Sequence, residues 1–321
     1  MPRTPAAARL TASTQPAVGV VGLGIMGSAM AANLLRAGFA VHGFDTAKAR
    51  TVHLKRLGGV GHEDVAGVAT QCRHIVLSLP SEAALLAVAR DLAQHGQRGG
   101  VVAELSTLPV ATKLQAQTML AAAGIVMLDC PLSGTGAQAQ ARDLVVYASG
   151  EAKAIERFRP IFDGFARSVC NVGAFGQGMR MKLVANLLVA IHNVSTAEAM
   201  LLGTRMGLDA AAMIEVLGDG AGSSRMLQVR GPTMRDRSWD KATMKIDVWA
   251  KDMGLIAAAL RDHAVPAPLF SATMPIYQAA LALGHGQHDT AAVYDVLEQW
   301  APPVPAKKTA PRRVASKKAQ A

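Results

Sequence analysis

A lysine and two asparagines stand on one stripe of a long apolar segment. Lys182 and Asn186 are four residues apart and Asn193 follows two turns later, so an α-helix would project all three from nearly one face. A lysine can accept or donate a proton in catalysis if its surroundings bring its pKa toward the working pH. The spacing predicts Lys182 as a proton-transfer residue, with Asn186 orienting it and hydrogen-bonding a substrate. On an exposed helix the same lysine would be an ordinary surface charge.

A glycine-rich turn near the start of the sequence has the spacing of a phosphate-binding loop. It follows the β-branched run 18–21 and precedes a helical stretch, which is the context that the GxGxxG pattern requires. Backbone amides and the helix dipole at such a turn bind a pyrophosphate. The residues of the turn are Gly22, Leu23, Gly24, Ile25, Met26 and Gly27.

An acidic residue follows the second predicted strand at the position where a dinucleotide fold uses one. Asp45 stands about twenty residues after the turn, where a carboxylate accepts hydrogen bonds from the ribose 2′-hydroxyl of NAD and repels the 2′-phosphate of NADP. Lys48 and Arg50 follow closely and could rotate toward a phosphate, or be solvated helix charges. The sequence predicts NAD as cofactor and leaves NADP possible.

The order of the predicted elements indicates an α/β fold followed by helices. From Val18 to about Val172, short β-branched runs alternate with helical stretches, which predicts a mainly parallel sheet covered by helices. The segment from Met179 to Met206 reads as one long helix that stops at Gly207. Further helical patterns cover 209–218, 242–263, 269–284 and 289–300.

This order predicts four regions along the chain. Residues 1–16 form a flexible extension, 17–177 a Rossmann dinucleotide-binding domain and 178–302 an all-helical domain for substrate binding and oligomerisation. Residues 303–321 read as a disordered basic tail, because a mixture of Pro, Ala and Lys buries too little apolar surface to fold. The long helix is expected to join the two domains.

Composition excludes several classes of protein. The formal net charge is +10, but residues 305–321 carry six of these charges, and removing them leaves 10 − 6 = +4. We therefore expect at most weak contacts of the tail with nucleic acid. No run approaches the roughly 20 continuous apolar residues of a membrane span. The three cysteines, without metal or disulfide spacing, predict a cytoplasmic protein without a metal site.

Four sequence blocks in a fixed order resemble the β-hydroxyacid dehydrogenase family, which includes 3-hydroxyisobutyrate dehydrogenase. The blocks are VGLGIMGSAMAANLLRAG at the glycine turn, DCPLSGTGAQA at 129–139, GQGMRMKLVANLLVAIHN at 176–193 and KDMG at 251–254. The resemblance spans about Val18 to Trp300. It implies an N-terminal Rossmann domain, a long connecting helix, a helical C-terminal domain, a catalytic cleft between the two and a homodimer or homotetramer.

The resemblance also implies roles for particular residues. The loop Ser133, Gly134 and Thr135 would bind the acid group of the substrate, which suits a glycine-rich turn that offers a hydroxyl and backbone amides. The family motif has a second glycine where Thr135 stands, which puts the size and polarity of the substrate in doubt. The residues implied near the cofactor are Leu79, Pro80, Thr107, Lys251 and Asp252.

The resemblance implies an NAD(P)-dependent oxidoreductase that transfers a hydride between the cofactor and a small 3-hydroxy acid or its semialdehyde or oxo acid. Two alternatives remain: an imine reductase, which shares the turn and the long helix, and an inactive dinucleotide-binding module with a nucleic-acid-binding tail. Both groups lack the catalytic lysine, so Lys182 argues against them.

Overall fold

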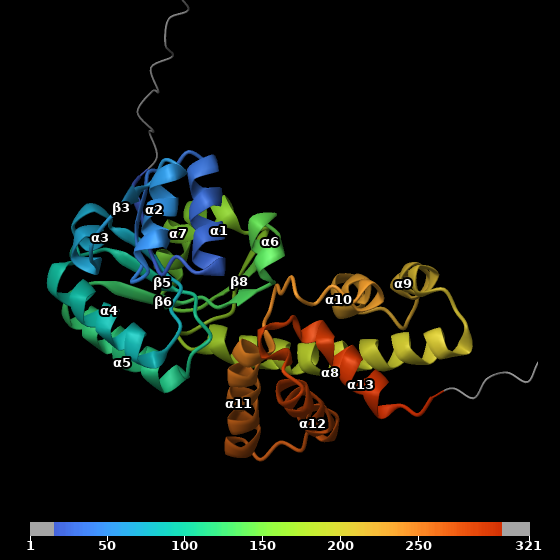
Figure 1. The fold of residues 1–321 in the computed structure, drawn as a ribbon. Helices are drawn as coiled ribbons and strands as arrows, with labels where there is room; N and C mark the ends of the chain where they lie inside the picture. Colours follow the sequence, from blue (N-terminus) through green and yellow to red (C-terminus); the bar gives the residue numbers. More distant parts are fainter. Residues whose placement is uncertain (1–15, 304–321) are drawn as a thin grey trace, which may run out of the picture.

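The N-terminal half of the protein is built on a six-stranded parallel sheet (Figure 1). The computed structural model describes residues 16–303, so the predicted extension and basic tail lie almost wholly outside the described residues. All five neighbouring strand pairs of this sheet run parallel, as the alternating pattern predicts. In spatial order the strands are β3 (Val60–Gly61), β2 (Val41–Phe44), β1 (Val18–Val21), β4 (His74–Leu77), β5 (Val101–Glu104) and β6 (Val126–Asp129).

Helices cover both faces of this sheet because successive strand residues point to opposite sides. Val20 and Val76 belong to the core beneath α1 and α7, whereas Val21 and Leu77 belong to the core beneath α3, α4 and α5. The strands therefore read as continuous apolar runs. The helices of this half are α1 (Ile25–Arg36), α2 (Lys48–Arg56), α3 (Val65–Gln71), α4 (Glu82–His95), α5 (Val110–Ala122), α6 (Gly136–Gln140) and α7 (Ala152–Phe165).

The strand order reverses between β1 and β4, which lie side by side at the middle of the sheet. Open α/β sheets bind ligands outside the carboxyl ends of the strands at such a reversal. The turn after β1 begins at Gly22, and the loop after β4 contains Leu79 and Pro80. The topology therefore brings the glycine turn next to the loop expected beside the cofactor.

The other three strands of residues 16–303 form a separate sheet. β7 (Leu132–Ser133) pairs antiparallel with β8 (Val145–Ala148), which pairs parallel with β9 (Ser168–Asn171). Strands β8 and β9 lie in the region from Val18 to about Val172 where the sequence predicts strands, but they do not join the main sheet. The sequence pattern missed β3 and β7 because two residues are too few to show alternation.

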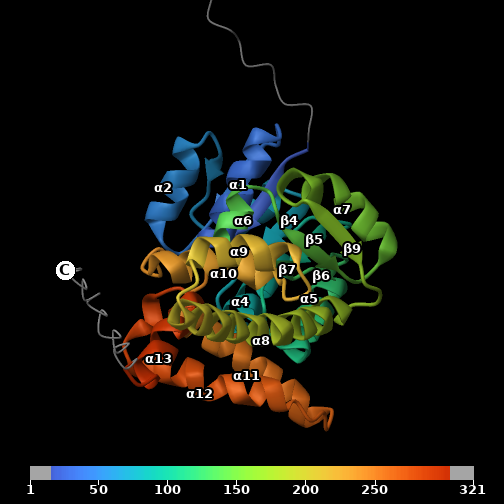
Figure 2. The same cartoon turned by 90° about the vertical axis from the view of Figure 1, so that its right-hand side faces the viewer.

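The C-terminal half packs around one long helix. Helix α8 (Gln177–Met206) agrees with the predicted segment to within two residues and ends at Gly207, whose left-handed conformation (φ 87°) suits glycine. The helix is long and apolar enough to span a membrane by length and composition alone. In the fold it is the core helix against which α10 to α13 pack (Figures 1 and 2).

One helix of this half escaped the sequence patterns. Helix α10 (Arg225–Asp236) contains Gly231 and Pro232, residues that usually break a helical pattern, yet it packs against α8. Tertiary packing outweighs local propensity here. The short 3-10 helix η1 (His285–Gln287) was not predicted either. The other elements lie near their predicted positions: α9 (Ala210–Asp219), α11 (Ile246–Asp262), α12 (Pro268–Ala282), the 3-10 helix η2 (Thr290–Ala292) and α13 (Val293–Trp300).

Candidate active site

The glycine turn leaves no room for a side chain at two of its positions. Gly22 has φ 90°, and a Cβ atom there would lie 2.1 Å from the carbonyl oxygen of Ser78. A Cβ on Gly27 would lie 1.8 Å from the carbonyl oxygen of Gly22, so α1 packs directly on the turn. Above Gly24 the space is open, because a Cβ there would meet only Arg50, at 3.9 Å.

The start of α1 is free to bind a phosphate. Gly24 is its N-cap residue and supplies no side chain to cap the amides of the first turn. The exposed amides and the positive end of the helix dipole form an anion site, and the open space above Gly24 lets a pyrophosphate approach the backbone. The turn therefore fits the dinucleotide that the sequence predicts.

Asp45 is tied into this turn. Its Oδ2 accepts a hydrogen bond from the amide of Leu23 at 2.7 Å, and its Oδ1 accepts one from the amide of Ala47 at 2.8 Å. Arg50 lies 3.2 Å from Oδ2, with about half of its side chain exposed. Lys48 begins α2 on the exposed surface. Arg50 therefore reaches the carboxylate, and its charge is available to a phosphate beside Asp45.

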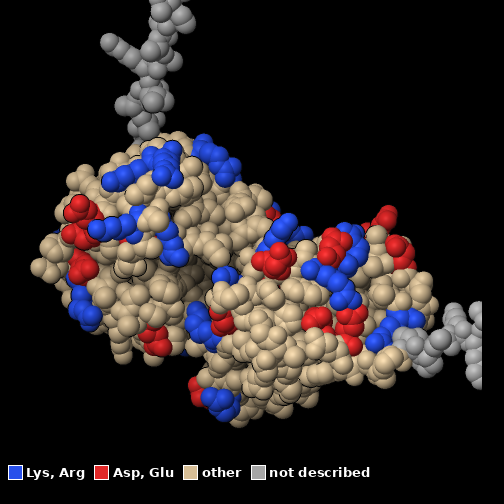
Figure 3. Space-filling model, in the orientation of Figure 1, with Lys and Arg blue, Asp and Glu red and all other residues tan. Residues whose placement is uncertain are grey.

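A cavity of about 690 Å³ runs from the turn to the helical half of the protein. Figure 3 shows the surface hollowed between the two halves on this face. The cavity walls combine the turn, the loop after β4, the loop before α6 and the start of α11. The residues from the predicted site that line it are Gly22, Gly24, Ile25, Met26, Asp45, Leu79, Pro80, Gly134 and Thr135.

Lys182 is buried, with 8% of its surface exposed. Among residues 16–303, none accepts a hydrogen bond or forms an ion pair with its amine. Burial lowers the pKa of Lys182 below its ordinary value, the charge of Lys251 lowers the pKa further, and the charge of Asp252 opposes both. The amine thus makes no hydrogen bond within the described chain, and its pKa lies below that of a lysine in water.

The residues predicted beside Lys182 form one polar cluster. Asn186 donates a hydrogen bond to Asp252 at 3.0 Å, and the amine of Lys251 donates one to the backbone oxygen of Thr107 at 2.7 Å. Burial raises the pKa of Asp252, while the charges of Lys251 and Lys182 lower it. The hydrogen bond from Lys251 to Thr107 joins α11 to the loop after β5, and so connects the two halves of the chain.

Eight predicted residues do not line this cavity. Five of them form the polar cluster around Lys182: Thr107, Lys182, Asn186, Lys251 and Asp252. Ser133 ends β7, and Leu23 and Gly27 are packed inside the turn. Asn193, on the same stripe as Lys182, does not face a cleft: its side chain donates hydrogen bonds to the Tyr277 hydroxyl and the Thr290 backbone oxygen, both at 2.9 Å. Asn193 therefore links α8 to α12 and η2 inside the helical core.

A buried ion cluster behind the site was missed from the sequence. Lys113 has no exposed surface, and its amine lies 2.7 Å from Glu104 Oε2 and 2.6 Å from Asp129 Oδ1. Burial by itself would lower the pKa of Lys113, but the charges of Glu104 and Asp129 outweigh it and raise the pKa. The sequence held one signal: Lys113 shares the buried stripe of α5 with Ala116 and Leu120.

The cluster connects the cofactor-side loops to the start of α8. Asp129 Oδ2 accepts the amide of Met179 at 2.8 Å, three residues before Lys182. Glu104 Oε1 accepts the amide of Ser106, whose hydroxyl accepts the amide of Leu79 at 2.7 Å. Lys113 thus holds two carboxylates in place. Glu104 fixes the loops after β4 and β5, and Asp129 fixes the start of α8.

Comparison with known proteins agrees with this geometry. Residues 17–176 match the family described as the NAD binding domain of 6-phosphogluconate dehydrogenase. Residues 176–297 match the family described as NAD-binding of NADP-dependent 3-hydroxyisobutyrate dehydrogenase. The two matches meet where α8 begins, and together they cover nearly all of the described chain.

Individual relatives resemble the chain over almost their whole length. An L-threonate dehydrogenase from Cupriavidus necator is 33% identical over 87% of this chain and 95% of its own. A 2-(hydroxymethyl)glutarate dehydrogenase from Eubacterium barkeri is 29% identical over 88% and 95%. The crystal structure of a 3-hydroxyisobutyrate dehydrogenase from Salmonella typhimurium superimposes with a TM-score of 0.79 at 30% identity, covering 88% of this chain and all of that one.

These matches favour hydroxy-acid oxidation over both alternatives, the imine reductase and the inactive module, because these relatives are named as dehydrogenases of hydroxy acids. The glycine turn, the open helix start and the Rossmann topology account for the binding of NAD, with NADP possible. The chain belongs to the β-hydroxyacid dehydrogenase family and is an NAD(P)-dependent oxidoreductase that transfers a hydride between the cofactor and a small hydroxy acid.

Proposed function

We propose that Lys182 is the proton-transfer residue of this reaction and that the substrate is a small, unphosphorylated 3-hydroxy acid or its semialdehyde. The observation that carries the proposal is a buried amine with a lowered pKa and no hydrogen-bond partner among the described residues. In its neutral form this amine removes the hydroxyl proton while bound NAD accepts the hydride; in the reverse direction it returns the proton.

The other residues of the site take supporting roles in this proposal. Asn186, held by Asp252, orients Lys182 and hydrogen-bonds the substrate. The loop Ser133 to Thr135 holds the carboxylate through the Ser133 hydroxyl and the Gly134 amide, because the Thr135 amide already donates to Gln138 Oε1. The residues that hold the dinucleotide are Gly22, Leu23, Gly24, Ile25, Met26, Gly27, Asp45, Leu79, Pro80, Thr107, Lys251 and Asp252.

An absorbance assay of the reduced nicotinamide tests the substrate class. Purified protein is mixed with NAD or NADP and with L-threonate, glycerate, 3-hydroxyisobutyrate or 2-(hydroxymethyl)glutarate. We expect turnover with at least one acid and a higher kcat/KM with NAD, because Asp45 lies at the end of β2. Binding of NAD without turnover of any acid would contradict the proposed substrate class.

The pH dependence of oxidation tests the role of Lys182. A general base must be neutral, so kcat should rise with pH through the pKa of Lys182, which lies below the ordinary 10.5. Because the charge of Asp252 raises this pKa, Asp252→Asn should move the rise to lower pH. Because the charge of Lys251 lowers it, Lys251→Gln should move the rise to higher pH. A rise that stays in place in both variants would assign it to another group.

We also propose that the protein is a cytoplasmic homodimer or homotetramer. Helix α8 exposes large apolar side chains at helical spacing, among them Val184, Leu188, Leu202 and Met206. Contiguous exposed apolar surface is typical of an interface between subunits. The cysteines of the described chain are free thiols, which suits a reducing compartment. We also retain the predicted domain boundary, with the dinucleotide-binding domain ending at residue 177 and the helical domain beginning at residue 178.

A further inference from the structure

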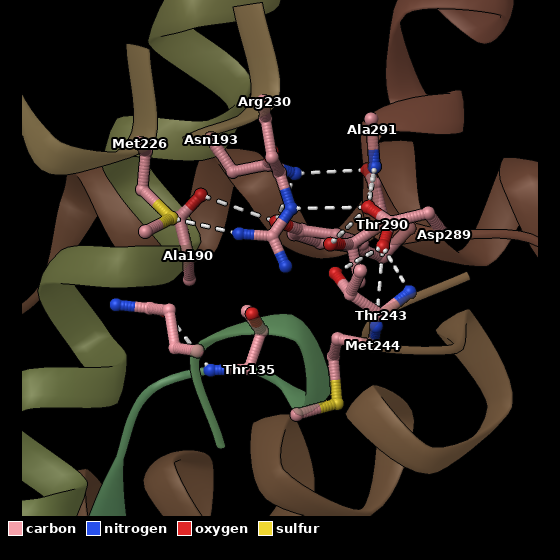
Figure 4. A network of polar contacts seen from close by, with 12 residues as sticks. Thr135, Ala190, Asn193, Met226, Arg230, Thr243, Met244, Asp289, Thr290 and Ala291 are labelled. Atoms are coloured by element: carbon pink, nitrogen blue, oxygen red, sulfur yellow. Dashed lines mark hydrogen bonds and ion pairs between the residues drawn. The ribbon is translucent and has the colours of Figure 1, made fainter. Parts of the chain in front are cut away.

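A buried arginine of α10 has one side of its guanidinium without a partner. Arg230 is 3% exposed, and its Nε donates a hydrogen bond to Asp289 Oδ1 at 3.2 Å. Its Nη1 contacts the sulfur of Met226, a weak acceptor. Its Nη2 makes no hydrogen bond within residues 16–303, and Figure 4 shows it free of dashed contacts.

Asp289 fixes this arginine beside the wall of the cavity. Its Oδ2 accepts hydrogen bonds from the amide and hydroxyl of Thr243, both at 2.8 Å, and from the amide of Met244 at 3.1 Å. Thr243 and Met244 line the cavity together with Thr135. Burial would raise the pKa of Asp289, but the charge of Arg230 and these hydrogen bonds outweigh it and lower the pKa. Asp289 is therefore ionised and rigidly placed.

A second unpartnered polar group faces the arginine. The Thr135 hydroxyl is buried at the N-cap of α6, in the capping-box position beside the Gln138 amide, and makes no hydrogen bond of normal geometry in the described chain. In Figure 4 the guanidinium of Arg230 points from α10 toward the loop that carries Thr135. Buried polar groups are normally paired, because leaving them unpaired costs free energy. Thr135 lines the cavity, and Arg230 is tied through Asp289 to Thr243 and Met244 of its wall, so the two groups indicate a binding position for a ligand at this wall.

The charges around this position favour a hydroxyl over a second carboxylate. Asp289 already neutralises Arg230, so the pair offers a fixed hydrogen-bond donor and little net charge. A hydroxyl can accept from Nη2 and also hydrogen-bond the oxygen of Thr135. Thr135 belongs to the loop proposed to hold the acid group, so this hydroxyl belongs to the same small molecule.

We propose that Arg230 and Thr135 form a subsite for a chain hydroxyl of the substrate, farther from its carboxylate than the reacting carbon, which selects polyhydroxy acids. The proposal rests on the function proposed above and narrows its substrate class. It also assigns a role to the threonine that replaces the second glycine of the family motif. Arg230 shares the buried stripe of α10 with Met226, Leu227 and Met234, where a charged side chain is unusual.

The test compares two substrates in matched variants. L-Threonate carries the additional chain hydroxyls, and 3-hydroxypropionate lacks them. Thr135→Val removes the hydroxyl at similar volume, and Arg230→Met removes the donor. Arg225→Met, at the exposed start of the same helix, is the control. Thermal unfolding of each variant shows whether it folds, and kcat/KM is measured with saturating NAD.

We expect Arg230→Met to lower kcat/KM for L-threonate by about 30-fold or more, because a buried hydroxyl loses its donor. Thr135→Val should lower it by about tenfold. The loss in each variant should be several-fold larger with L-threonate than with 3-hydroxypropionate, and Arg225→Met should match the wild type with both acids. If Arg230→Met does not fold, the proposal is tested by the ratio of kcat/KM for the two acids in Thr135→Val and Arg230→Lys.

Three results would overturn the subsite. One is an equal loss with both acids, which assigns Arg230 a structural role only. Another is wild-type protein that oxidises 3-hydroxypropionate but not L-threonate, which leaves the proposed function standing. The third is a preference for 2-(hydroxymethyl)glutarate that depends on Arg230, which assigns the position to a carboxylate. Wild-type protein that binds NAD and oxidises none of these acids would instead refute the proposed function.

Discussion

Lys182→Met is expected to lower kcat by about 10²–10⁴-fold without weakening the binding of NAD. Methionine fills a similar volume but cannot accept or donate the proton, so hydride transfer must proceed with proton transfer to water. Because Lys182 is buried and its amine has no hydrogen-bond partner in the described chain, removing it breaks no contact that supports the fold. The loss should therefore appear in kcat rather than in the amount of folded protein.

Steady-state kinetics and titration of NAD by protein fluorescence measure the two quantities separately. Arg180→Met is the matched control, since Arg180 lies on the exposed side of the same helix, two residues away. The control should retain wild-type kcat. A Lys182→Met protein that keeps its activity would show that another group transfers the proton, and one that also loses NAD affinity would show that Lys182 supports the cofactor site.

Lys113→Met is expected to lower the free energy of unfolding by about 3–5 kcal/mol. The substitution leaves Glu104 and Asp129 facing each other without a cation, in a position with no exposed surface. One carboxylate must then take up a proton or the site must open to water, and either costs stability. The same change loosens the first turn of α8, because Asp129 holds the amide of Met179.

The midpoint of urea unfolding, followed by circular dichroism, measures this effect. Lys153→Met, in the exposed part of α7, removes the same charge without burying an unpaired one and should leave the midpoint unchanged. Adding Glu104→Gln to Lys113→Met removes one of the two facing charges and should restore part of the lost stability. A midpoint equal to that of the wild type in Lys113→Met would refute the role of the cluster.

Local features of the site could be predicted from the sequence because they depend on neighbouring residues. Gly22 and Gly27 mark a turn between a strand and a helix, and all three parts are contiguous in the chain. Lys182 and Asn186 share a helix face because a helix repeats every 3.6 residues, and Gly207 ends that helix because it alone tolerates φ 87° without strain. Periodicity and backbone sterics suffice for each of these conclusions.

The contacts between distant segments were decided by the tertiary structure. Lys251 meets the backbone of Thr107 across 144 positions of sequence, and no pattern along the chain reports that distance. Helix α10 forms despite Gly231 and Pro232 because its apolar stripe packs against α8. Pairing between remote residues follows from how helices and sheet pack, so the environment of each charge exists only in the folded chain.

The partners of the buried charges illustrate this limit most clearly. The sequence places Lys113 among apolar residues and does not reveal the helix that carries Arg230, and it does not say what neutralises either charge. Their carboxylates come from β5 and β6 for Lys113 and from Asp289 for Arg230. A charge leaves water only when an opposite charge is brought to it, and it is the packing of the folded chain that brings the two together.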